Sequence, residues 1–146
     1  MNKRPKILVV CPTSWERSEL AKPEQQAQYE FITCCDELYE SLSVLRALRF
    51  DARAYLRATA ARYRSAGLSG VLGTGDYPGC IFAAFIAEQL GLPAPTPRDA
   101  VLLSHKLYSR QRQRAVAPEA TPHFAALDPR RPQRPPELGY PFFVKP

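Results

Sequence analysis

The hydrophobic pattern of the chain opens with a short strand. Lys6 to Cys11 is an apolar run ended by Pro12, which predicts a strand buried on both faces, as in a parallel sheet. Residues 13–35 show no clean period, and we expect a loop-rich excursion there. Part of it, 16–29, has helical character that is broken at Pro23. The pattern therefore predicts one buried strand before residue 36.

A leucine repeat follows this excursion. Asp36 is expected to cap a helix that runs to about Arg49, because leucines recur on one face at Leu38, Leu42, Leu45 and Leu48. Asp51 to Leu56 alternates polar and apolar residues, which predicts a second strand. Residues 57–66 predict another helix that ends at Gly67.

A third strand and a strongly apolar helix come next. Ser69 to Thr74 predicts a strand, and residues 78–90 predict a buried helix with proline in its first turn and Gly91 just past its end. Strands and helices that alternate with short links form right-handed crossovers. We therefore expect an α/β fold, with a Rossmann-like parallel sheet covered by helices on both faces.

The character of the chain changes after this helix. Residues 92–98 hold three prolines and indicate a linker, and 99–115 predict a helix rich in Arg, Gln and Leu. Strands are predicted at 122–129 and at Tyr140 to Val144, on either side of a proline-dense mobile connection at 129–136. The expected organisation is two domains, 1–97 and 98–146.

Charge is concentrated in the second of these parts. The formal net charge is +6; residues 1–97 hold 11 Lys and Arg against 10 Asp and Glu, whereas 98–146 hold 9 against 4. An anionic partner should therefore bind the basic second part, although a solvated surface explains most of its arginines. Aromatic residues do not interleave with these arginines, so nucleic acid is not the expected partner.

Apolar runs are too short for a membrane protein. None approaches the roughly 20 residues that span a bilayer, and the few apolar residues before Pro12 are too short for a signal-peptide core. We expect no membrane partner and a cytoplasmic location. The oligomeric state, a homodimer included, is open.

The cysteines do not follow a metal-binding spacing. Cys11, Cys34, Cys35 and Cys80 form no CxxC and lie far in the sequence from both histidines, so a zinc site is not expected. In a reducing compartment the simplest role is that of small buried hydrophobes. The alternative is a redox-active vicinal pair at Cys34 and Cys35.

A glycine-rich turn between the third strand and its helix has two interpretations. The three glycines at 73, 75 and 79 form a variant of the dinucleotide-binding fingerprint. That turn usually follows the first strand, however, and Asp76 would compete with a phosphate for the helix N-terminus. In the second interpretation the glycines permit a tight turn and Asp76 stabilises the start of the helix.

Ligands of open parallel sheets collect beyond the carboxyl ends of the strands. On the predicted strands these ends are residues 13–17, 55–57 and 74–79. We choose three of these residues as candidate contacts for a small polar substrate: Thr74, Asp76 and Tyr77.

Residues 86–111 contain LGLP at 90–93 and then a helix with the pair His105-Lys106, and 139–146 read GYPFFVKP, with Lys145 39 residues after Lys106. Together with 110–127 between them, these segments resemble ATP-grasp ligases such as biotin carboxylases and carbamoyl-phosphate synthetases. The resemblance implies that Lys106 and Lys145 are the two lysines that reach the nucleotide phosphates, although His105 stands where the family has aspartate. Two ammonium groups on separate elements suit the charge of a triphosphate.

The resemblance implies an enzyme that transfers the γ-phosphate of ATP to a carboxylate or bicarbonate, after which an amine or similar nucleophile attacks the acylphosphate. ATP and Mg²⁺ would be the cofactors. The family's glycine-rich loop, adenine-reading hinge and metal ligands lie after the second lysine. The resemblance therefore implies an N-terminal domain and the start of a nucleotide-binding domain, inactive without the missing C-terminal part of the polypeptide.

Two alternatives stay open at this point. One is a self-contained Rossmann-like module, non-catalytic or NAD(P)-dependent, that binds a nucleotide at the 73–79 turn. The other is a nucleic-acid-binding module that uses the basic second part, for which binding would depend steeply on salt.

Overall fold

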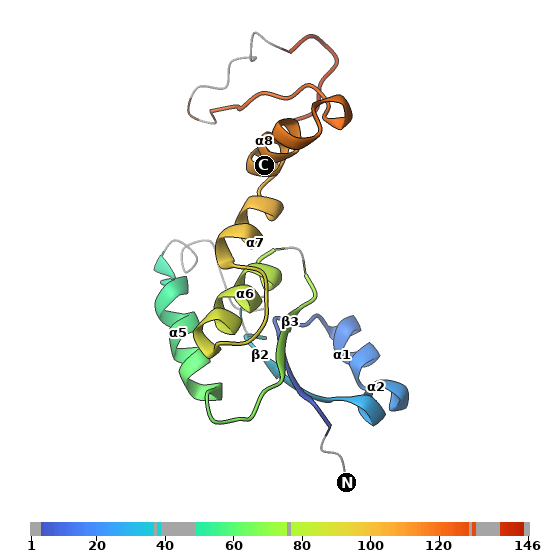
Figure 1. The fold of residues 1–146 in the computed structure, drawn as a ribbon, viewed down its shortest axis with the longest axis vertical. Helices are drawn as coiled ribbons and strands as arrows, with labels where there is room; N and C mark the ends of the chain where they lie inside the picture. The colour runs from blue at the N-terminus through green and yellow to red at the C-terminus, as the bar shows by residue number, and fades with distance from the viewer. Residues whose placement is uncertain are drawn as a thin grey trace. The chain divides into compact units, whose positions relative to one another are not determined.

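The structure, a computed structural model, describes residues 4–36, 38, 49–75, 77–128, 130 and 138–144. The chain divides into two units, Met1–Ala100 and Val101–Pro146. The first unit holds the sheet, and its described elements run from β1 to α6 (Figure 1).

Three strands form the sheet. β1 (Lys6–Val10) lies between β2 (Glu30–Cys34) and β3 (Gly70–Gly73), and both neighbours pair with it in parallel. Its residues Leu8, Val9 and Val10 are each 0% exposed. A central parallel strand is covered on both faces, which explains why the sequence of β1 is a continuous apolar run rather than an alternating one. The predicted α/β class with a parallel sheet is confirmed.

Helices cover both faces of the sheet. α1 (Ser14–Leu20) and α2 (Pro23–Gln28) lie on one side, and α5 (Ala52–Tyr63) and α6 (Gly79–Leu90) lie on the other (Figure 1). Right-handed crossovers are expected to give this arrangement, because the chain crosses the sheet in one direction from β1 to β2 and in the opposite direction from β2 past β1 to β3.

The core is built where α5 and α6 meet the sheet. Their inward faces place Leu56, Ala60, Ala83 and Ile86 in one cluster with Leu8 and Val10 of β1. Small alanines on both helices allow the backbones to approach the strands, and β1 lies at the centre of the packing. A helix that packs in this core has to be apolar, and the apolar sequence of residues 78–90 predicted that α6 is buried.

The prediction of a second strand at residues 51–56 is wrong. This segment is the first half of α5, and the Asp51 carboxylate accepts a hydrogen bond from the backbone N–H of Ala54 at 2.9 Å. The apparent alternation spans too few residues to distinguish a strand from a helix. Leu56 and Ala60, four residues apart, form the buried face that decides in favour of the helix.

The strand that occupies this place in the sheet is β2, inside the segment expected to be a loop-rich excursion. Its partial helical character and the break at Pro23 are confirmed, because α1 ends at Leu20 and α2 begins at Pro23. The strand itself was missed because most of its residues are half-buried and show no clear period. The leucine-rich helix expected from Asp36 to Arg49 lies largely outside the described residues.

The last two elements of the first unit match their predictions. β3 and α6 fall within the expected ranges, and α6 ends at Gly91, whose φ of 68° is left-handed. Its N–H satisfies the carbonyls of Ala87 and Glu88. Glycine adopts this conformation without the cost that a Cβ would impose.

The end of the chain differs from the prediction. The expected helix at 99–115 is two helices, α7 (Pro97–Ser104) and α8 (Lys106–Val116), followed by a 3₁₀ turn, η1 (Pro118–Ala120). Neither 122–128 nor Tyr140 to Val144 is a strand, although both are described. A strand needs a neighbour to accept its hydrogen bonds, and the described residues supply none to either segment.

We predict that Gly73→Ala destabilises the first unit by about 1–3 kcal/mol, the range for overpacking. A Cβ on Gly73 would collide with the backbone of the α6 start, at 2.6 Å from the Gly79 carbonyl carbon and 2.9 Å from the Cys80 Cα. Chemical denaturation of the two forms measures the difference.

The matched control is Gly70→Ala in the same strand. Its Cβ would lie 3.4 Å from the flexible end of Ile7, so the change should stay below about 1 kcal/mol. Equal stability of Gly73→Ala and Gly70→Ala would contradict the proposed close approach of β3 and α6.

Candidate functional site

The carboxyl ends of β1 and β3 form the natural ligand-binding edge of this sheet. The chain leaves β1 for α1 and leaves β3 for α6, which cover opposite faces (Figure 1). Adjacent parallel strands whose connections diverge in this way leave a crevice between their loops. The side chains at this edge come from the residues just after each strand.

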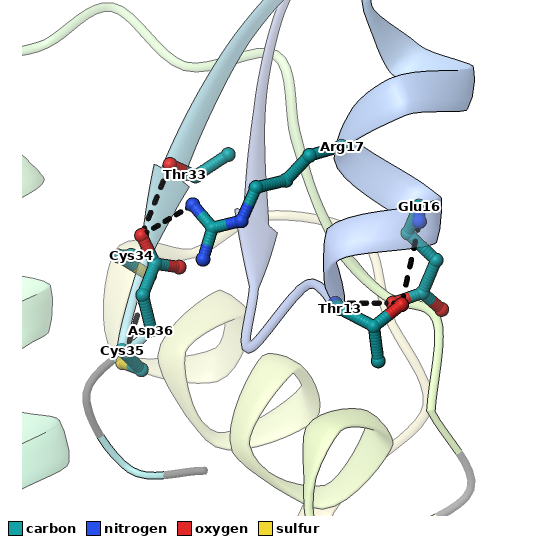
Figure 2. A network of polar contacts seen from close by, with 7 residues as sticks. All are labelled: Thr13, Glu16, Arg17, Thr33, Cys34, Cys35 and Asp36. Atoms are coloured by element: carbon teal, nitrogen blue, oxygen red, sulfur yellow. Dashed lines mark hydrogen bonds and ion pairs between the residues drawn. The ribbon is translucent and has the colours of Figure 1, made fainter. Parts of the chain in front are cut away.

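The loop after β1 is fixed by a capping box. The hydroxyl of Thr13 accepts from the backbone N–H of Glu16 at 3.3 Å, and both the backbone N–H and the hydroxyl of Thr13 donate to Glu16 Oε2, at 2.6 and 2.8 Å. The reciprocal bonds satisfy donors that a helix start leaves open. They also hold the Glu16 carboxylate at the sheet edge (Figure 2).

Glu16 connects this loop to the end of β3. The side chain of Thr74 hydrogen-bonds to the Glu16 carboxylate, and this bond is the largest cause of a lowered pKa for Glu16. The backbone and side chain of Thr13 lower the pKa further, whereas burial opposes them. The bridge therefore keeps Glu16 ionised and joins two loops that are far apart in sequence.

The next residue, Arg17, reaches in the other direction, to the end of β2. Its guanidinium lies 2.7 Å from Asp36 Oδ2, an oxygen that also accepts from the Thr33 hydroxyl at 3.4 Å (Figure 2). Both charged side chains are more than a third exposed, so the pair contributes about 0–1 kcal/mol. Its role is positional, because it places a carboxylate and a guanidinium at the carboxyl edge.

A cavity of about 250 Å³ opens between the end of β2 and α5. It is lined by Thr33, Cys34, Cys35, Asp36, Tyr55, Thr59, Arg62 and Tyr63. Hydroxyl, thiol, carboxylate and guanidinium groups all reach this space, which is somewhat smaller than a typical drug-sized site. Such a lining suits a small polar molecule.

The residues chosen from the sequence are placed differently by the structure. Thr74 lies at the sheet edge in contact with Glu16, and Tyr77 is nearby along the chain with 73% of its surface exposed. Asp76 and Lys145 lie outside the described residues. Lys106 is the first residue of α8, in the second unit. The binding roles of all five stay predictions.

Sequence reasoning missed the part of the site that depends on β2. Residues 55–57 were interpreted as a strand end, whereas Tyr55 lines the cavity from α5. The helix that Asp36 was expected to cap lies largely outside the described residues, and the sequence gave no sign that Asp36 pairs with Arg17. The available signal was Phe31-Ile32-Thr33, a short aromatic and β-branched run that ends at the two cysteines.

The start of α8 is suited to an anion. Lys106 is exposed, the first turn of the helix contains no acidic residue, and His105 makes no side-chain capping bond. The His105 ring instead stacks on Tyr108, with centroids 4.3 Å apart. The open N–H groups of the first turn and the ammonium of Lys106 give this end a positive potential.

No three His, Cys, Asp or Glu side chains among the described residues are grouped so that they could hold a metal ion. Within the same ranges, no helix has the length and apolar character needed to cross a membrane. In comparisons with known proteins, no family model, no curated protein and no solved structure matches the chain.

We predict that Thr74→Val raises the pKa of Glu16, because the change removes the hydroxyl that stabilises the carboxylate. An NMR titration of the Glu16 side-chain carboxyl measures it. The lowered pKa means that ionised Glu16 stabilises the fold above its unfolded pKa, and this stabilisation is lost as the pH falls through the folded pKa. Thr74→Val should therefore also weaken the pH dependence of unfolding in that range.

The matched control is Thr59→Val, the same substitution on α5. The Thr59 hydroxyl donates to the backbone carbonyl of Tyr55 at 3.0 Å, within its own helix, so its loss should leave the titration of Glu16 as in the original protein. An unchanged pKa in Thr74→Val would show that the bridge between the β1 and β3 loops does not form in solution.

Proposed function

We propose that these residues are the N-terminal portion of an ATP-grasp ligase that activates a carboxylate as an acylphosphate with Mg-ATP and joins it to an amine or a similar nucleophile. The first unit would correspond to the α/β domain that precedes the nucleotide site. The second unit would be the beginning of the nucleotide-binding domain. The motifs at 90–106 and 139–146 support this assignment, and so does the parallel sheet that precedes them.

The observation that carries the proposal is the exposure of large apolar side chains in the described part of the second unit. None of its residues at 101–128, 130 and 138–144 is buried, and Phe143, Val116 and Val144 are 95%, 80% and 64% exposed. A folded domain buries its large apolar side chains in one core. Further residues that pair with Tyr140–Val144 as a strand would supply that core, as the ATP-grasp assignment requires.

The position of Lys106 supports the assignment. An exposed ammonium at the positive end of α8 suits the phosphates of ATP, whose charge is spread over several oxygens. Lys145, which follows the Tyr140–Val144 segment in sequence, would approach the same phosphates once that segment is paired. Both lysines would act by neutralising charge as the γ-phosphoryl group moves.

The proposed chemistry has two steps. A carboxylate oxygen of the substrate attacks the γ-phosphorus and ADP leaves; the nucleophile then attacks the carbonyl carbon and phosphate leaves. Thr74, Asp76 and Tyr77 are the proposed contacts of the small substrate. Mg²⁺ would offset the phosphate charge, and we place its ligands in the further part of the polypeptide rather than in the described residues.

The glycine turn no longer supports the competing Rossmann-like interpretation, in which it binds a nucleotide. A Cβ on Gly73 would meet the backbone of Gly79 and Cys80, so packing alone accounts for this glycine. The turn therefore does not require a dinucleotide phosphate to explain its composition.

Calorimetry with Mg-ATP tests the proposal directly. We expect no tight binding by residues 1–146 and clear binding by a chain that continues into the residues encoded after Pro146. Tight Mg-ATP binding by residues 1–146 alone would contradict the proposal, and so would a following sequence that lacks a glycine-rich loop and paired acidic residues.

In the longer chain, Lys106→Ala should weaken ATP binding by about tenfold or more, as expected when a charge-assisted phosphate contact of about 1.5–3 kcal/mol is lost. Arg112→Ala is the matched control, since Arg112 is an exposed cation of the same helix, away from its first turn. Equal losses for the two variants would indicate a general charge effect and remove Lys106 from the site.

Lys145→Ala in the same longer chain should weaken ATP binding to a similar degree, because the second lysine neutralises a different part of the triphosphate. Isothermal titration of the purified variant measures this. Unchanged ATP affinity would exclude Lys145 from the nucleotide site while leaving the role of Lys106 to its own test.

A further inference from the structure

Three cysteines meet at the carboxyl ends of β1 and β2. Cys11, Cys34 and Cys35 are 1%, 8% and 4% exposed, and all three are in the reduced form. The Cys35 thiol lies 3.6 Å from Cys34 Sγ (Figure 2). These thiols belong to the core cluster around β1 but lie outside the Glu16–Thr74 bridge, and the proposed ligase chemistry uses none of them.

The strand register places Cys11 opposite Cys35. Val10 pairs with Cys34, and the backbone N–H of Cys11 donates to the carbonyl of Cys34 at 2.9 Å, which continues the parallel ladder one residue past β1. Neighbouring strands are about 4.8 Å apart. That spacing falls within the range of roughly 4.4–6.8 Å between Cα atoms that a disulfide can bridge.

The vicinal pair is less suited to a disulfide. Consecutive Cα atoms are about 3.8 Å apart across a trans peptide, which is shorter than the Cα separation of an ordinary disulfide. Cys11 is therefore the better partner for Cys35, although the Cys34 thiol lies close to it.

The backbone holds both residues in an unusual conformation. Cys11 has φ 52° and Cys35 has φ 63°, left-handed values that residues with a Cβ adopt at a cost of about 1–2 kcal/mol. Such residues persist where the surrounding packing determines them, and they cluster at functional sites. Here the same conformation occurs twice, one residue past the ends of two adjacent strands.

The cavity beside β2 gives a small molecule access to two of the three thiols. Cys34 and Cys35 line it, together with the side chains of Tyr55 and Thr59 from α5. Its volume of about 250 Å³ admits a small oxidant. A bulky disulfide such as oxidised glutathione is too large to enter whole.

The surroundings also favour a thiolate at Cys35. Hydrogen bonds from the Cys11 thiol and then the Cys34 thiol lower the pKa of Cys35, with smaller help from Tyr55 and Thr59, and together they outweigh burial. The same interaction and burial raise the pKa of Cys34. The thiolate is the nucleophilic form of cysteine.

We propose that Cys35 is a peroxide-reactive thiol and that Cys11 resolves its oxidised form into a disulfide. The Cys35 thiolate attacks one oxygen of the peroxide; the O–O bond breaks, and the departing oxygen is protonated, leaving sulfenic acid on Cys35. Cys11 then attacks that sulfur. The S–S bond forms, the S–O bond breaks, and the hydroxyl leaves as water with the Cys11 proton.

The electrons balance in this sequence. The two cysteines together lose two electrons, and hydrogen peroxide takes them up to become two molecules of water. A cellular dithiol of the thioredoxin class would reverse the step by thiol–disulfide exchange. The site is thus a reversible modification site for peroxides.

The test treats the folded chain with hydrogen peroxide, blocks the remaining thiols by alkylation under denaturing conditions, and maps peptides by mass spectrometry. We expect two of the four cysteines to escape alkylation and a linked peptide pair that contains Cys11 and Cys35. A link between Cys34 and Cys35, a link to Cys80, or full alkylation of all four thiols would each overturn the proposal.

Variants separate the two roles. Cys35→Ser should slow thiol loss by at least about tenfold, whereas Cys11→Ser should leave sulfenic acid on Cys35 that dimedone captures. Cys80→Ser is the matched control and should react as the original chain does. Equal oxidation of Cys35→Ser and Cys80→Ser would exclude Cys35 as the nucleophile.

A comparison within the original chain keeps the test decisive if the serine variants do not fold. The same protein is oxidised folded and in urea, and the rate of Cys35 modification is followed in each. We expect faster modification in the folded state, because the thiol cluster exists only there. Slower or equal modification of Cys35 in the folded state would overturn the proposal.

Discussion

The pairing of β1 with both of its neighbours is the constraint on which the first unit depends. Leu8, Val9 and Val10 are wholly buried, and the strand bonds to β2 on one edge and to β3 on the other. Segments that are far apart in sequence therefore end side by side. Every polar side chain at the carboxyl edge takes its position from this one strand.

Two adjacent residues of α1 make contacts that connect the ends of the three strands. Glu16 contacts Thr74 beyond β3, and Arg17 contacts Asp36 beyond β2, so a single turn of α1 connects all three strand ends. The three thiols use the same edge differently, because they lie under it in the core. The cavity beside β2 connects the two, because Cys35 and Asp36 both line it.

Much of the first unit could be predicted from local pattern. Residues 6–11, 69–74 and 78–90 carry signals strong enough to identify two strands and a buried helix, and the α/β class followed from their order. The middle strand could not be located in the same way. Residues 51–56 alternate over too short a window, whereas β2 has a half-buried surface and hence no regular period.

The candidate site, like the fold, could be predicted from the sequence only in part. The sequence placed Thr74 and residues 13–17 at strand ends, and the structure brings Thr74 to Glu16. It gave no means of pairing Arg17 with Asp36, because that contact requires β2 to lie beside β1. The strand expected at Tyr140–Val144 is apolar and exposed instead, since side-chain composition favours a strand but only a neighbour can complete its hydrogen bonds.

By itself, then, the sequence determined the class of fold, the buried central strand and the residue types available for chemistry, because these depend on local periodicity and composition. The tertiary structure alone decided which strands are neighbours and which side chains meet. Cys11 and Cys35 are the clearest case: 24 residues separate them in the chain, and only the parallel register of β1 and β2 sets them opposite each other.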